Sequence, residues 1–359
     1  MTPKKKEEIT TPALLLDLSK MEYNINKMAD FFKDREANVR PMFKTPKLVP
    51  IALRQLEAGA CGITCAKLSE AEVLVEGGVN DILIANQVIG EDKIARLIAL
   101  SETADVKVAV DDEVHIDTLS EASQKAGIEQ GVLIEVNVGL QRCGVKPEKA
   151  VEIARLVNKT PGLILRGVMG YEGHVVLNKD EEVRKTEAEK SMEMLVRAAK
   201  SLRQEGMACD IVSGGGTGTY NITGGFPGIT EVQAGSYVMM DTTYDKLSLG
   251  FKKAVTILST VQSRALEGRA VIDAGVKVMS KDFGLPELIG NPDTRLVGLS
   301  EEHGHLSAEG KDPGLVIGEK VELYPSHICT TINQHDRIYA MRDDRVEEVW
   351  PIGARGCSQ

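Results

Sequence analysis

The feature that most constrains the fold is a pattern that repeats between about residue 38 and residue 240. Eight times, a short β-forming apolar run ends in Gly, Pro or polar residues, and a longer helical stretch usually follows. These runs are Asn38–Phe43, Gly62–Cys65, Asp81–Ala85, Val106–Val110, Val132–Val136, Leu165–Gly170, Asp210–Ser213 and Glu231–Gly235. Strands covered by helices on both faces are continuously apolar in this way. The pattern therefore predicts alternating β and α units around a parallel sheet.

The connecting segments support this interpretation. In Lys67–Glu76, the apolar residues Leu68, Ala71 and Val75 fall at i, i+3 and i+7, which is helical spacing. Residues 180–204 form a longer, highly charged stretch with the same periodicity. Eight such units are typical of a closed (β/α)8 TIM-type barrel. An open, doubly wound sheet is the structural alternative.

After about residue 245 the pattern changes to β-rich segments without long helices between them. These segments are Lys253–Gln262, Arg269–Ala274, Gly314–Tyr324, Asp336–Met341 and Val346–Trp350. They predict a C-terminal antiparallel β domain. The apolar run Ala13–Asp17 lies outside the eight and is expected to pair with that domain. We therefore predict a barrel over residues 18–245 and a β domain over residues 246–359, completed by an N-terminal strand at residues 10–17.

Charge and cysteine content narrow the class of protein. The chain has 43 Lys and Arg against 53 Asp and Glu, a net charge of −10, which argues against nucleic acid or an anionic membrane as partner. No apolar run approaches the roughly 20 residues of a membrane helix, and Met1–Glu8 does not resemble the start of a signal peptide. Six cysteines in 359 residues are too sparse for a disulfide scaffold. We expect a cytoplasmic enzyme with a small-molecule substrate.

Unusual polar residues follow the predicted strands. Lys44 follows the first run, Arg142 the fifth, and Tyr171–His174 the sixth. The seventh run leads into the glycine-rich segment 214–218, and the eighth into Gly235–Tyr237. Catalytic residues of βα barrels lie on the loops after the carboxyl ends of the strands. We therefore expect these residues to meet at one mouth of the barrel.

The glycine-rich segment 214–218 predicts an anion site. Consecutive glycines let backbone N–H groups approach an anion closely, and Thr217 or Thr219 could add a hydroxyl donor. In barrels the loops after the seventh and eighth strands commonly bind phosphate. A tight turn is the alternative explanation, but the matching Gly235-Ser236 after the eighth run favours phosphate.

Lys44 is a candidate for covalent catalysis because it lies at the end of a predicted strand. A partly desolvated lysine has a lowered pKa and can form a Schiff base. Lys47 is the competing candidate, and a merely solvated Lys44 is the simpler explanation. A lysine, an arginine and a phosphate site at one barrel mouth together suit pyridoxal phosphate.

His327-Ile328-Cys329 is a candidate metal site in the β-rich part of the chain. On a strand, residues i and i+2 share a face, so the imidazole and thiolate could bind one cation. Water or substrate would fill the other positions, as a catalytic metal requires. Taken alone, the pair is better explained as a buried cysteine beside a hydrogen-bonded histidine. A thiolate ligand would favour zinc over manganese or magnesium.

Together these segments resemble the D-threonine aldolase and D-serine dehydratase family. The resemblance covers almost the whole chain, in order. It is carried by Arg40–Lys47, Gly62–Lys67, Glu70–Glu72, Val138–Gly144, Gly170–His174, Ser213–Thr217 and Ser326–Cys329. Members are fold-type III pyridoxal phosphate enzymes with an alanine-racemase-like barrel and a C-terminal β domain. The resemblance implies both pyridoxal phosphate and a divalent metal (Zn, Mn or Mg).

The resemblance also implies a role for each candidate residue. Lys44 would form the Schiff base with the cofactor, Arg142 would neighbour its phenolic oxygen, and Tyr171 would line it. His174 would be the base for the substrate's β-hydroxyl proton. The phosphate would be held by Gly214, Gly215, Gly216, Thr217, Gly235, Ser236 and Tyr237. His327 and Cys329 would bind the metal that chelates the β-hydroxyl.

Two departures from the family's pattern bear on the reaction. Relatives often carry histidines where this chain has Met42 and Pro46. Aldolase relatives often show His-x-Asp at the metal pair and dehydratase relatives His-x-Cys, so Cys329 indicates a dehydratase while His174 indicates an aldolase.

We expect a D-threonine aldolase type of lyase that converts D-3-hydroxy amino acids into glycine and an aldehyde. The alternatives are a D-serine or D-3-hydroxyaspartate dehydratase, which forms a 2-oxo acid and ammonia, an amino-acid racemase, or a non-catalytic pyridoxal-phosphate-binding protein. The resemblance further implies a homodimer.

Overall fold

The structure is a computed structural model that describes residues 4–359. Met1–Pro3 lie outside the described residues. They are the first part of the segment Met1–Glu8, which is not expected to be a signal peptide. The chain divides into two compact units. The first, called the β unit below, comprises residues 4–26, 45–48 and 236–356. The second, the barrel unit, comprises residues 27–44, 49–235 and 357–359.

The barrel unit contains one parallel sheet with the order β2-β9-β8-β7-β6-β5-β4-β3. Its strands are β2 (Asn38–Val39), β3 (Ile63–Cys65), β4 (Asp81–Ile84), β5 (Asp105–Val110), β6 (Gln130–Glu135), β7 (Leu163–Met169), β8 (Ile211–Gly214) and β9 (Glu231–Val232). Met42 forms a parallel bridge with Thr64, and the Phe43 N–H donates to the Thr64 carbonyl oxygen at 2.7 Å. Because these contacts join the two ends of the sheet, the strands form the closed barrel that the sequence predicts.

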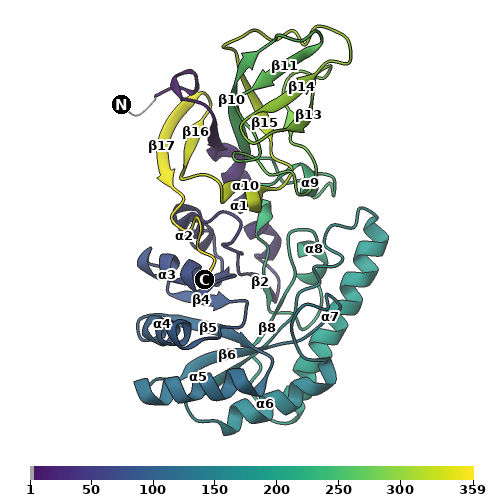
Figure 1. The fold of residues 1–359 in the computed structure, drawn as a ribbon. Coiled ribbons are helices and arrows are strands. Elements are labelled where there is room, and N and C mark those ends of the chain that lie inside the picture. Colours follow the sequence, from purple (N-terminus) through teal and green to yellow (C-terminus); the bar gives the residue numbers. More distant parts are fainter. Residues whose placement is uncertain (1–3) are drawn as a thin grey trace. The chain divides into compact units, whose positions relative to one another are not determined.

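Helices surround these strands on the outside (Figure 1). They are α2 (Val49–Glu57), α3 (Leu68–Glu76), α4 (Glu91–Ser101), α5 (Glu113–Ala126), α6 (Ala150–Lys159), α7 (Glu181–Gln204) and α8 (Tyr220–Thr223). The predicted helices at 67–76 and 180–204 are confirmed as α3 and α7. The Asp180 carboxylate begins α7 by accepting the N–H groups of Glu182 and Val183. Among residues 4–359, no helix combines the length and apolarity that a membrane span requires.

The β unit contains a mixed sheet of nine strands, shown in Figure 1. They are β1 (Ala13–Asp17), β10 (Val255–Ser263), β11 (Arg269–Ile272), β12 (Glu287–Leu288), β13 (Arg295–Leu299), β14 (Gly304–Ser307), β15 (Lys320–Tyr324), β16 (Arg337–Arg342) and β17 (Arg345–Pro351). The pairing of β1 with β16 is parallel, whereas the other pairings between these strands are antiparallel. Short helices α9 (Thr242–Asp245) and α10 (Ile328–Ile332) also belong to this unit, and α1 (Leu18–Phe32) follows β1.

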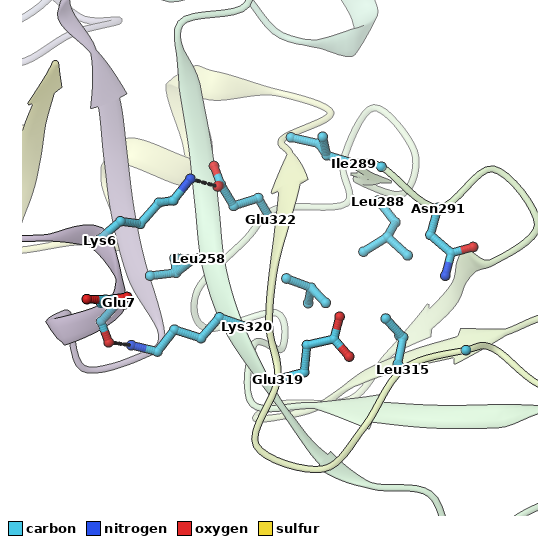
Figure 2. A pocket seen from close by; sticks show the side chains of 13 residues that line it. Lys6, Glu7, Leu258, Leu288, Ile289, Asn291, Leu315, Glu319, Lys320 and Glu322 are labelled. Atoms are coloured by element: carbon cyan, nitrogen blue, oxygen red, sulfur yellow. Dashed lines mark hydrogen bonds and ion pairs between the residues drawn. The ribbon is translucent and has the colours of Figure 1, made fainter. Parts of the chain in front are cut away.

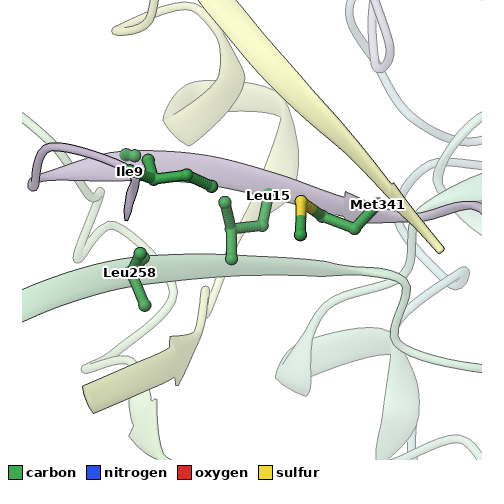
Figure 3. Packing of buried hydrophobic residues seen from close by; sticks show 5 residues of the cluster. Ile9, Leu15, Leu258 and Met341 are labelled. Carbon is green, nitrogen blue, oxygen red and sulfur yellow. The ribbon is translucent and has the colours of Figure 1, made fainter. Parts of the chain in front are cut away.

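Strand β1 belongs to the sheet of the β unit, as the sequence predicts, because it pairs with β10 on one edge and β16 on the other. Its apolar side chains explain the placement. Leu15 lies in a buried cluster with Ile9, Leu258 and Met341, which come from three separate parts of the chain (Figure 3). Removing such side chains from water contributes about 1.5–3 kcal/mol each.

The β unit also contains a cavity of about 520 Å³ (Figure 2). Leu258 and Leu315 supply part of an apolar lining. On the polar side, Lys6 pairs with Glu322 at 2.7 Å, and the Lys320 amino group donates to the carbonyl oxygens of Glu7 and Ile9, at 2.6 Å each. Lys6, Lys320 and Glu322 therefore already have partners at this cavity.

Candidate functional site

The candidate residues of the barrel unit follow the carboxyl ends of their strands. Lys44 lies beyond β2, and Arg142 lies on the loop after β6. Tyr171 and His174 follow β7, and the glycine-rich segment continues from the end of β8. This is the end of a parallel barrel at which active sites are built.

Direct contacts bring three of these loops together. The Arg142 guanidinium carbon lies 5.8 Å from the centre of the Tyr171 ring. That ring packs on Gly216, because a Cβ atom added there would lie 3.2 Å from the ring. The His174 ring packs on Gly139 after β6, where an added Cβ would lie 2.5 Å from Cε1. The loops after β6, β7 and β8 therefore form one continuous surface.

A buried carboxylate holds the glycine-rich segment. Glu172 is fully buried and accepts hydrogen bonds from the Gly215 N–H at 3.0 Å, the Thr219 hydroxyl at 2.7 Å and the Thr223 hydroxyl at 2.8 Å. Hydrogen bonds to an ionised acceptor are stronger than neutral ones, so they fix this loop. Sequence reasoning assigned no role to Glu172, although it quoted the segment Gly170–His174 that contains it.

The same segment fits a phosphate group. Only glycine fits at position 218, where a Cβ would lie 1.8 Å from the Val176 carbonyl oxygen. The N–H groups of Gly218 and Gly235 donate no hydrogen bond within residues 4–359. Backbone donors left available beside a glycine cradle are what an oxyanion requires. Thr217, also a predicted phosphate ligand, is buried here.

Two further predicted phosphate ligands, Ser236 and Tyr237, belong to the β unit. They lie in a short 3-10 turn, Ser236–Val238, and both are buried. The Tyr237 ring packs against Phe251, with 5.5 Å between the ring centres. The Phe251 ring thus helps to hold the Tyr237 side chain in place.

The structure distinguishes the two candidate lysines. Lys44 is exposed, and its amino group makes no hydrogen bond or ion pair within residues 4–359. Lys47 is buried, has a left-handed backbone with φ 52°, and its amino group donates to the Ala354 carbonyl oxygen at 3.1 Å. A lysine held in this way cannot readily exchange partners, so Lys44 fits a reactive amine better.

The metal-pair candidates do not lie on a strand, and that premise of the sequence prediction was wrong. His327 is the N-cap of α10, and Cys329 lies in its first turn. The buried Asp241 explains the turn, because its carboxylate accepts the Ile328 N–H at 3.0 Å. The same carboxylate caps α9, so it joins the two short helices.

Both side chains of the pair are nevertheless held in place. The His327 Nδ1 lies 2.7 Å from the Asp282 Oδ2, and the Phe283 ring stacks on the imidazole with 4.1 Å between ring centres. The Thr45 hydroxyl lies 3.2 Å from the Cys329 Sγ. Burial lowers the pKa of His327, but Cys329 and Asp282 together raise it to about 9. These partners therefore make the imidazole more basic.

An imidazole and a thiolate are ligands that zinc takes in proteins. Since Asp282 occupies Nδ1, the Nε2 atom of His327 is the one left to bind a metal. Within residues 4–359, no third His, Cys, Asp or Glu ligand atom joins this pair in a cluster. The remaining coordination positions would then be open, as in catalytic metal sites.

One cluster in the barrel unit was not predicted. Ligand atoms of Asp111, Glu135 and Cys143 lie within 4.8 Å of one another, at the ends of β5 and β6. The Gly144 N–H donates to Asp111 at 2.7 Å and the Gln87 amide to Glu135 at 2.6 Å. Hydrogen bonds thus already engage an oxygen of each carboxylate. Burial raises the pKa of Glu135.

The alanine racemase N-terminal domain family matches residues 16–243, and a serine dehydratase domain matches residues 254–341. A similar curated protein is 3-hydroxy-D-aspartate aldolase of Paracoccus denitrificans, which is 38% identical over 97% of this chain and 93% of its own length.

Solved structures agree with these matches. D-threonine aldolase from Filomicrobium marinum is 38% identical, with a TM-score of 0.95 over 98% of each chain. D-threo-3-hydroxyaspartate dehydratase from Delftia sp. HT23 is 29% identical, with a TM-score of 0.90 over 97% of this chain and 99% of its own. A cysteine-to-alanine variant of D-threo-3-hydroxyaspartate dehydratase was solved in a metal-free form.

Proposed function

Because this chain belongs to the D-threonine aldolase and D-serine dehydratase family, whose N-terminal domain is alanine-racemase-like, we propose that it is a pyridoxal-phosphate-dependent lyase. It cleaves D-3-hydroxy amino acids into glycine and an aldehyde. The observation that carries this proposal is the match to aldolases at 38% identity over nearly the whole chain. The placement of His174 on the surface that also presents Arg142 and the glycine-rich segment supports it.

Residues of the barrel unit would hold the cofactor. Lys44 would bind it through its exposed amino group. The N–H groups of Gly218 and Gly235 and the Thr217 hydroxyl would bind its phosphate. Pyridoxal phosphate supplies an electron sink for negative charge at the substrate Cα. We propose that residues 18–245 form this cofactor-binding domain, while residues 246–359 with residues 10–17 carry the metal pair.

His327 and Cys329 would hold a divalent metal, for which the soft thiolate favours zinc over manganese or magnesium. A bound metal of this kind lowers the pKa of a coordinated hydroxyl. His174 would remove the proton from the substrate's β-hydroxyl oxygen. The exposed imidazole makes no hydrogen bond within residues 4–359 that would restrain it from doing so. Loss of that proton allows the Cα–Cβ bond to break.

Cys329 favours a second candidate, a dehydratase. A His-x-Cys pair is the arrangement expected of dehydratase relatives, and a dehydratase structure matches this chain at 29% identity. In that reaction Lys44 would remove the Cα proton and the β-hydroxyl would leave. The products would be a 2-oxo acid and ammonia.

Product identification separates the two reactions. We expect purified protein loaded with pyridoxal phosphate and zinc to convert D-threonine into glycine and acetaldehyde, measured by coupling to alcohol dehydrogenase. A parallel assay coupled to lactate dehydrogenase detects 2-oxobutanoate. Formation of 2-oxobutanoate without acetaldehyde would replace the aldolase by the dehydratase. L-threonine is the control for configuration.

Three variants assign the roles. Lys44→Ala should abolish the visible absorbance of the bound cofactor, whereas Lys47→Ala should retain it. His174→Gln should lower acetaldehyde formation by about 10²–10⁴-fold, the usual contribution of a general base, without preventing cofactor binding. Retained absorbance in Lys44→Ala would move the covalent role to Lys47. A homodimer and a cytoplasmic location are further proposals that rest on the sequence resemblance and composition.

A further inference from the structure

We infer that Asp282 is a positioning residue that orients His327 as a metal ligand. The inference rests on the proposed metal function of His327 and Cys329. It concerns the loop 280–283, which the sequence did not mark as part of the site. All of these residues belong to the β unit.

The oxygens of Asp282 are already committed. Oδ2 lies 2.7 Å from the His327 Nδ1, while Oδ1 accepts from the Ser280 hydroxyl at 2.5 Å and the Thr330 hydroxyl at 3.2 Å. Thr330 also approaches Oδ2, at 3.2 Å. Because both oxygens have partners, Asp282 lies behind the imidazole as an acceptor and not in front of it as a third ligand.

This arrangement fixes the chemical form of His327. A carboxylate that accepts the Nδ1 proton leaves the lone pair on Nε2 and makes that nitrogen more basic, so it binds a metal more tightly. The adjacent Phe283 restrains the ring as well, since the two planes are inclined by only 11°. Rotation of the imidazole away from the metal would break the hydrogen bond and the stacking together.

A purely structural role for Asp282 makes a different prediction. If the carboxylate only fixed its own loop through Ser280 and Thr330, replacing it would lower stability without a specific effect on the metal. Asp282→Asn separates the two roles. It keeps the shape of the side chain and an oxygen acceptor, but removes the negative charge that polarises Nδ1–H.

The test is zinc affinity of the full-length protein loaded with pyridoxal phosphate, measured by competition with a chromophoric chelator. We expect the wild type to bind one zinc ion per chain and His327→Ala to lose this binding. Asp282→Ala should weaken zinc binding by about 10–100-fold, the usual effect of removing an outer carboxylate, and Asp282→Asn by less. The absorbance of bound pyridoxal phosphate should not change.

Asp293→Ala is the matched control. Asp293 belongs to the same unit, and its carboxylate forms an ion pair with Lys311 at 3.9 Å. Removing that carboxylate should leave the zinc affinity unchanged. A wild type that binds no zinc would overturn the proposed metal function. If the wild type binds zinc and Asp282→Ala binds it with equal affinity, the role of Asp282 is overturned while the proposed metal function stands. If Asp282→Ala does not fold, Asp282→Asn takes its place in the test. A zinc affinity of Asp282→Asn equal to that of the wild type would then overturn the role of Asp282.

Discussion

At the scale of single residues, Glu172 places a negative charge beside a loop proposed to bind a phosphate. Two negative charges at close range repel each other, so the placement needs a compensating gain. The gain is geometric, because one carboxylate fixes Gly215, Thr219 and Thr223 at once. The loop therefore already has its binding conformation before phosphate binds.

Replacing that carboxylate by an amide tests this balance. Glu172→Gln presents an NH₂ group to one of three donors, which costs about 1–3 kcal/mol for an unsatisfied buried group. We expect the dissociation constant for pyridoxal phosphate to rise about tenfold, which corresponds to 1.4 kcal/mol. Titration of the cofactor-free protein measures it. Glu187→Gln, an exposed change on α7, should have no effect, and tighter binding in Glu172→Gln would show that charge repulsion outweighs loop geometry.

The candidate residues that the sequence predicted and those that it did not differ in a physical way. Lys44, His174 and the glycines are recognisable because their residue types are unusual at the end of a strand. Glu172 and Asp282 act by accepting hydrogen bonds from groups distant in the sequence or hidden in loops. Such partnerships leave no periodic or compositional signal, so only the structure shows them.

At the scale of secondary-structure elements, Arg40 connects three strands of the barrel. It donates to Glu231, the first residue of β9, at 2.9 and 2.7 Å, and to Asp81, the first residue of β4, at 2.5 Å. Its side chain is almost fully buried. The amino ends of barrel strands carry stability, whereas the carboxyl ends carry catalysis. Through the amino ends of β4 and β9, Arg40 therefore stabilises the closed barrel.

Arg40→Met should lower the free energy of unfolding by about 3–5 kcal/mol, because it leaves the buried Glu231 without its cation. Urea denaturation measures the loss. Arg96→Met removes an arginine that makes a similar forked contact with Glu72 on the surface, and should cost less than about 1 kcal/mol. Equal losses in both variants would contradict a structural role specific to Arg40.

Sequence patterns located the barrel strands well, since each of the eight predicted runs overlaps an observed strand. Buried parallel strands are continuously apolar, and that signal is local. The β unit was harder. Its short strands β12, β13 and β14 have mixed burial and were not predicted. The α10 segment was taken for a strand because its turn depends on Asp241, a hydrogen-bond partner far away in the sequence.

At the scale of the whole molecule, the candidate metal ligands and the glycine-rich segment belong to different compact units. A ligand stabilises the structure that binds it, and local opening is suppressed most near the bound group. We expect zinc to slow amide hydrogen exchange in α9 and α10, and pyridoxal phosphate to slow it in residues 213–219. Mass spectrometry of peptides from each unit measures both effects. Removal of zinc with EDTA should restore fast exchange in α9 and α10 only. If residues 213–219 also lose protection on EDTA treatment, the two ligands do not protect their units independently.

The place of β1 has a consequence for biosynthesis. Its partners in the sheet, β10 and β16, begin at residues 255 and 337, so the ribosome has to make more than two hundred further residues before β1 can pair. At the usual rates of translation this takes on the order of tens of seconds. During that time Leu14, Leu15 and Leu16 remain unpaired on the nascent chain while the barrel strands emerge behind them. Among the strands of this structure, β1 leaves the ribosome first and is among the last to be covered, so it would be accessible to chaperones during synthesis.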